Sequence, residues 1–144
     1  MREIKFKAYD KVSKSISPEF NLFGEFTLLG AVFAWIDHVR GLPDGSAGLL
    51  SLNEIDVLQF TGLKDKNGVE IYEGDILAAP FANGEYAKNI KRKIFNVSVT
   101  ITPENGASMN FPKDAWKGNY RWYPHFIQCE VIGNIYQNPE LVKP

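Results

Sequence analysis

The strongest constraint on the fold is a long alternating stretch at residues 91–111, KRKIFNVSVTITPENGASMNF. One side of this extended chain would carry four apolar residues, Phe95, Val97, Val99 and Ile101. A period of two is typical of a β-strand with one buried face. The Asn105–Gly106 pair that follows is a favoured turn between paired strands. The stretch therefore predicts a hairpin within a mainly β fold.

Weaker strand signals lie elsewhere in the chain. Alternation predicts strands within residues 1–11 (MREIKFKAYDK), 54–60 (EIDVLQF) and 126–136 (FIQCEVIGNIY). A short apolar run at residues 75–81 (DILAAPF) predicts another strand, ended by Pro80. A helix is predicted from Thr27, because apolar residues then recur at helical spacing until Gly41 and Pro43 stop the run. Many short strands and one helix are the expected elements.

These elements predict a mainly β fold, namely a small twisted β-barrel with one inserted helix. The barrel could be SH3-like. An α+β arrangement is the alternative. The chain has 144 residues, of which 44% are hydrophobic, and this can form one substantial core. We therefore expect a single domain over residues 1–144.

Charge and cysteine content narrow the function classes. A formal net charge of −1 gives no overall attraction to nucleic acid or to an anionic membrane. The apolar segment from Leu28 to Ile36 is about half of the ~20 residues that a membrane-spanning helix needs, so we expect none. The lone Cys129 can form no internal disulfide, and no secretory signal is evident. Both observations favour a cytoplasmic protein.

A polar, glycine-rich stretch, TGLKDKNGVEIYEGD, occupies residues 61–75 between two apolar runs. Its glycines do not have the spacing of a phosphate-binding loop, which would end in Gly-Lys-Ser/Thr. Asn67–Gly68 and Glu73–Gly74–Asp75 instead predict two turns around one short strand. Turns are thus favoured over a ligand loop. The candidate surface of this motif consists of Asp65, Lys66, Asn67, Glu70, Tyr72, Glu73 and Asp75.

Three blocks of the sequence resemble the signature blocks of the YopX family of phages and prophages. They are MREIKFKAYDK at the start, VLQFTGLKDKNGVEIYEGDIL in the middle and EVIGNIYQNPELV at the end. The resemblance implies a small mainly β protein of viral origin, acting in a bacterial cytoplasm, whose biochemical role is unestablished. It supplies no catalytic, cofactor-binding or metal-binding residues.

Catalytic and metal sites have weak support. His38 and His125 are far apart, and Cys129 has no second ligand at metal-binding spacing. A nucleophilic pair of Cys129 with His125 is the alternative to simple packing, which is favoured because free Cys is usually buried. Among the carboxylates, an acid or base role for Glu70, Glu73 or Asp75 is less favoured than hydrogen bonding within the turns.

A basic run gives the best local argument for nucleic-acid binding. It consists of Lys88, Lys91, Arg92 and Lys93, and aromatic side chains for base stacking would come from Trp116, Tyr120, Trp122 and Tyr123. The alternative, which the slightly negative net charge favours, is a solvated strand edge whose charges discourage aggregation.

The leading hypothesis is a non-enzymatic phage or prophage accessory protein that needs no cofactor. It would act by binding a protein partner or a second copy of itself. Nucleic-acid binding through Lys88–Lys93 and a small hydrolase-type enzyme are the alternatives.

Overall fold

The computed structural model describes residues 5–21, 27–47, 53–83, 91–111 and 124–142. These residues are mostly in strands, with one α-helix, so the predicted mainly β fold with an inserted helix is confirmed. The chain forms two compact units, Met1–Phe60 and Thr61–Pro144. That they act as one domain over residues 1–144 stays a prediction.

The first unit is built around β1 (Lys5–Asp10), in the alternating N-terminal stretch that predicted a strand. It pairs antiparallel with the two-residue strands β2 (Ser15–Ile16) and β3 (Phe20–Asn21). On its other side it pairs with β4 (Ile55–Lys64). Within this unit the strand order is β2-β1-β4, with β3 also paired to β1.

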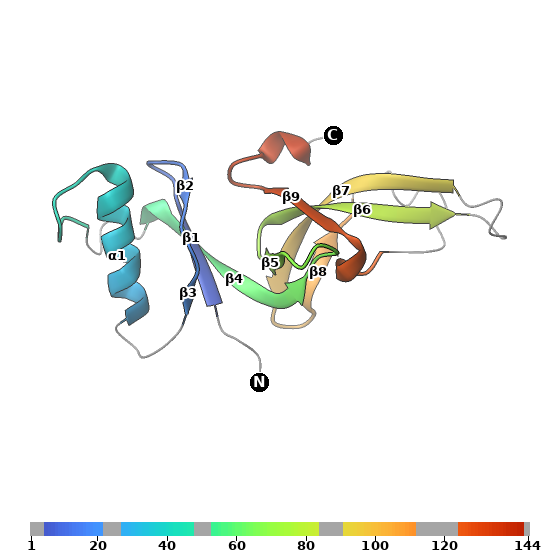
Figure 1. The fold of residues 1–144 in the computed structure, drawn as a ribbon, viewed down its shortest axis with the longest axis horizontal. Helices are drawn as coiled ribbons and strands as arrows, with labels where there is room; N and C mark the ends of the chain where they lie inside the picture. Colours follow the sequence, from blue (N-terminus) through green and yellow to red (C-terminus); the bar gives the residue numbers. More distant parts are fainter. Residues whose placement is uncertain (1–4, 22–26, 48–52, 84–90, 112–123, 143–144) are drawn as a thin grey trace. The chain divides into compact units, whose positions relative to one another are not determined.

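The helix α1 (Thr27–Arg40) begins at the residue that the sequence predicted. It lies beside β1 and β3 (Figure 1). Its Val32 and Ile36 form a buried cluster with Ala8 of β1 and Ile55 of β4. Gly41 ends the helix with a φ of +66°, a left-handed conformation that glycine adopts without strain.

A buried ion pair connects the end of α1 to the turn after β1. Arg40 donates from Nη2 to Asp10 Oδ1 over 2.6 Å and from Nε to Asp10 Oδ2 over 2.9 Å. Asp10 also accepts the backbone N–H groups of Val12 and Ser13 and the Ser13 hydroxyl. Every donor is local except Arg40, which therefore provides the link between helix and turn.

The second unit contains a four-stranded antiparallel sheet in the order β8-β7-β6-β9. The strands are β6 (Asp75–Asn83), β7 (Lys91–Thr102), β8 (Gly106–Asn110) and β9 (Glu130–Asn134). The predicted hairpin is β7–β8, and the alternation of β7 is confirmed, since Phe95, Val97 and Val99 are buried. Their core cluster also contains Ile71, Leu77, Ala79, Phe81 and Cys129.

Several predicted strand limits are wrong, and β4 continues past the predicted end at Phe60 to Lys64. Pro80 does not end β6, which continues to Asn83. Pro80 faces Ile94 of β7, while β9 pairs only with residues 75–78 of β6. Within the described ranges, the missing N–H of Pro80 therefore removes no bond to β9.

The C-terminal strand also begins later than predicted, because Phe126–Gln128 is a 3₁₀ helix. Gln128 Oε1 accepts the backbone N–H of His125 over 2.8 Å, and the Cys129 N–H donates to the Phe126 carbonyl over 3.0 Å. Local bonds of this kind compete with strand pairing. The predicted aromatic segment with Trp116, Tyr120, Trp122 and Tyr123 lies outside the described residues.

No helix within the described ranges is both long enough and apolar enough to cross a membrane.

Candidate functional site

The central motif forms the two turns that the sequence predicted, on either side of β5 (Glu70–Tyr72). The first turn is organised by Asp65, whose side chain is buried, with 3% exposure. Its Oδ1 accepts the backbone N–H groups of Asn67 over 2.8 Å and Val69 over 2.9 Å. Its Oδ2 accepts the N–H of Val131 in β9 over 3.0 Å. One carboxylate thus holds its own turn and the start of the C-terminal strand.

The electrostatics of Asp65 fit this role. Burial by itself raises the pKa of the carboxyl. The three backbone N–H donors and the charge of Lys66 outweigh burial, so the pKa lies below its usual value. Asp65 is therefore an ionised hydrogen-bond acceptor rather than an acid that exchanges protons near neutral pH.

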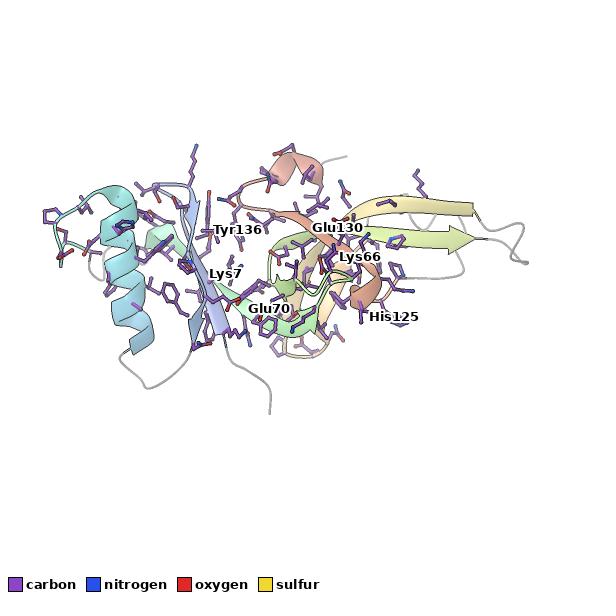
Figure 2. All side chains as sticks on the ribbon, in the orientation of Figure 1. Lys7, Lys66, Glu70, His125, Glu130 and Tyr136 are labelled. Atoms are coloured by element: carbon purple, nitrogen blue, oxygen red, sulfur yellow. The ribbon has the colours of Figure 1, made fainter. Side chains whose placement is uncertain are left out.

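Lys66 makes two further connections to the C-terminal segment. Its backbone N–H donates to the Cys129 carbonyl over 2.9 Å. Its Nζ lies 3.6 Å from Glu130 Oε2, and the two side chains are side by side in Figure 2. Both are about half exposed, so the ion pair adds little stability. The backbone bond is the more important connection.

The second turn also joins the C-terminal segment. Gly74 donates its N–H to the Val99 carbonyl and accepts the N–H of Ile135, both over 2.8 Å. Its φ is +87°, and a Cβ at this position would lie 2.6 Å from Cε2 of the Tyr136 ring. Asp75 closes the turn, because its Oδ2 accepts the Tyr72 N–H over 2.8 Å.

The candidate surface of the motif is therefore divided by burial. Lys66 and Asn67 are exposed, and Glu70, Glu73 and Asp75 are half-buried. Asp65 and Tyr72 are buried. A binding role for the exposed and half-buried members stays a prediction.

The basic run is only partly described. Lys88 lies outside the described residues, and Lys91 and Arg92 are placed as backbone of β7, opposite Asn83 and Ala82. Lys93 is exposed, with its Nζ 5.0 Å from the centre of the Phe95 ring, a cation–π contact. The structure thus places at least one cation of the run at the surface.

Cys129 and His125 do not form a catalytic pair. The Cys129 thiol is fully buried and donates to the His125 carbonyl oxygen over 3.4 Å, rather than contacting the imidazole. Burial, and then the charge of Asp65, raises the pKa of the thiol to about 11. A thiolate nucleophile is disfavoured in this environment, and the predicted packing role is confirmed. In the part of the chain that the structure describes, no three His, Cys, Asp or Glu side chains gather at a metal-binding site.

The comparison with protein families identifies the family of this chain. A family model described as YopX protein matches residues 42–143, which is more than half of the chain. The chain belongs to the YopX family. The match includes both blocks joined by Asp65, Lys66 and Gly74, whereas the first YopX-like block, within residues 1–11, precedes the matched range.

A solved structure supports the fold over nearly the whole chain. The crystal structure of protein EF1440 from Enterococcus faecalis is similar with a TM-score of 0.53 and 24% sequence identity, covering 97% of this chain and 98% of that one. At this identity the similarity shows the fold alone. No curated protein has significant sequence similarity to this YopX-family chain.

The close approach of Tyr136 to Gly74 gives a matched pair of variants in this YopX fold. Gly68→Ala and Gly74→Ala both place a side chain at positive φ, +81° and +87°, but only the second meets an atom within 4 Å. Gly74→Ala is therefore expected to lower the free energy of unfolding by about 1–3 kcal/mol more than Gly68→Ala. Urea unfolding curves measure the difference, and equal losses would show that the Tyr136 ring moves aside freely.

Proposed function

We propose that this protein is a phage or prophage accessory protein that acts without catalysis, by binding another macromolecule through the Thr61–Pro144 unit. The partner is a protein, or a second copy of this chain, in the cytoplasm of a bacterial host. Membership of the YopX family supports the phage context that the resemblance implies.

The observation that carries the proposal is the exposure of two large apolar side chains on this unit. Ile127 is 70% exposed and Ile94 is 65% exposed, the highest values among the large apolar side chains of the described residues. Ile94 lies on β7 opposite Pro80 and next in sequence to the exposed Lys93. Apolar contacts with charged neighbours are typical of protein interfaces.

The hydrogen bonds of the central motif support binding over catalysis. Asp65 is engaged by three backbone N–H groups, and the Cys129 thiol is buried in the core. Asp75 accepts a backbone N–H within its own turn. These side chains serve as structural groups, which leaves the exposed surface as the better candidate for function.

Affinity capture tests the proposal. The full chain and the double variant Ile94→Ser, Ile127→Ser are used to capture partners from a lysate of an induced prophage-carrying host. We expect the double variant to recover at least about tenfold less of any specific partner, because buried apolar anchors dominate interface energy. Val57→Ser is the matched control, since Val57 is 54% exposed on the other unit. Equal recovery by all three proteins would contradict the proposal.

Nucleic acid is the second candidate partner, favoured by the consecutive cations Lys91, Arg92 and Lys93 in β7. The same capture distinguishes it when nuclease-treated and untreated lysates are compared. A nucleic-acid partner would disappear after nuclease treatment and after replacement of the three cations with Ala, but would survive the Ile variants.

A further inference from the structure

Two Asn–Gly pairs lie in turns of the second unit, and both expose the asparagine. Asn67–Gly68 is in the first turn of the central motif, and Asn105–Gly106 is in the β7–β8 hairpin. Each glycine has positive φ, +81° and +65°, and nothing lies within 4 Å of its Cβ position. A third pair begins at Asn83, but its glycine lies outside the described residues.

An Asn–Gly pair can modify itself with water as the only other reactant. The backbone nitrogen of the glycine loses its proton to a base and attacks Cγ of the asparagine. A new C–N bond forms, the bond to the side-chain nitrogen breaks, and that nitrogen leaves as ammonia. Water then opens the cyclic imide to aspartate or isoaspartate. Glycine favours the attack because it has no side chain to block it and permits backbone rotation.

The surroundings of Asn67 oppose this rearrangement. The attacking nitrogen would be that of Gly68, whose N–H donates to the Asp65 carbonyl over 3.1 Å. The N–H groups of Asn67 and Val69 both donate to Asp65 Oδ1. Asp65 is buried and also bound to Val131 of β9. Before Gly68 can attack, the turn must open, and hydrogen bonds fix this turn at three positions.

Asn105 is held less firmly. Its N–H donates over 3.1 Å to the hydroxyl of Thr102, an exposed hydrogen bond. Gly106 pairs with Thr102 as the last pair of the hairpin ladder. Terminal pairs of a ladder open at lower free energy than bonds that are tied to a buried group.

We propose that Asn105 is a site of spontaneous deamidation in the folded protein and that the Asp65 turn protects Asn67 from the same reaction. The product places a new carboxylate, partly as isoaspartate, at the tip of the β7–β8 hairpin. This modification is independent of the proposed binding function.

The test follows both asparagines in one sample. The full chain is incubated in mildly alkaline buffer, with and without denaturing urea, and peptide mass spectrometry follows the replacement of the side-chain NH₂ by OH. In urea the two sites should react at similar rates. In the folded protein we expect Asn105 to react roughly tenfold or more faster than Asn67, because several hydrogen bonds must break at Asn67.

Two variants complete the test. Asn105→Gln should abolish the reaction at the hairpin, because the imide ring closes poorly from Gln, while Asn67 stays slow. Asp65→Ala, assayed where circular dichroism shows a folded protein, should speed the reaction at Asn67 roughly tenfold. Equal rates at Asn67 and Asn105 in the folded wild type, or an unchanged Asn67 rate in folded Asp65→Ala, would overturn the proposal.

Discussion

Replacing Arg40 with Met is expected to lower the free energy of unfolding by about 3–5 kcal/mol, because it leaves a buried carboxylate without its counter-charge. Asp10 has 0% exposure, and Arg40 is its ion-pair partner through two nitrogens. Met keeps the apolar stem of the side chain but ends before the guanidinium, so the variant removes the charge together with the contact of Arg40 Nη1 with Glu54 Oε1 over 3.5 Å. Urea denaturation at neutral pH measures it.

The pH dependence of this loss separates charge from packing. The hydrogen bond from Arg40 holds the pKa of the Asp10 carboxyl well below its usual value. Because the pKa of this carboxyl is lower in the folded than in the unfolded state, its full contribution to the free energy of unfolding is present above the unfolded-state pKa of about 3.9. The contribution is lost as pH falls toward the folded-state pKa. The wild type should therefore lose stability on acidification, and the deficit of Arg40→Met should narrow. A deficit that stays constant with pH would attribute the loss to packing.

The second large effect is expected at Asp65. Asp65→Ala should lower the free energy of unfolding by about 2–4 kcal/mol, since three backbone N–H groups lose their acceptor. In the variant, the N–H groups of Asn67 and Val69 can form hydrogen bonds with water, because both residues are exposed. Val131 is half-buried, so its N–H should account for much of the lost stability.

Asp75→Ala is the matched control for Asp65→Ala. Its carboxylate also accepts a backbone N–H in a turn of the same motif, that of Tyr72. We expect a smaller loss for Asp75→Ala, about 1–2 kcal/mol, because Asp75 is half-buried whereas Asp65 is buried. Chemical denaturation of both variants gives the comparison, and amide hydrogen exchange at Val131 should accelerate only in Asp65→Ala. If Val131 exchanges at the wild-type rate, the connection between Asp65 and β9 carries no energy.

Local patterns in the sequence predicted the elements whose causes are local. The alternation around Val97 sufficed for β7, because a strand with one buried face needs an apolar residue at every second position. The start of α1 at Thr27 and the turns at Gly68 and Gly74 followed from residue preferences at single positions. Each of these signals lies within a few residues, so the local pattern was enough to predict the element, although distant contacts add to its stability.

Features that join distant segments could not be predicted in this way. Asp10 and Arg40 are 30 residues apart, and Asp65 and Val131 are 66 apart. No periodic pattern connects such pairs. The sequence identified Asp65 as part of a polar motif, but only the fold shows that its carboxylate is used internally. The predicted end of β6 at Pro80 was wrong for the same reason. Whether a strand tolerates a proline depends on the neighbouring strand that its missing N–H would face.

The attachment of β9 has a consequence for the order in which the second unit can assemble. Asp65 and Gly74 lie near the beginning of the second unit, and their partners Val131 and Ile135 belong to the final part of the chain. During synthesis the β6–β7–β8 strands emerge first, with these bonds unmade. The turns of the central motif therefore acquire their final stability only after Val131, 66 residues from Asp65, has joined them. The formation of β9 is thus a late, entropically demanding step of folding.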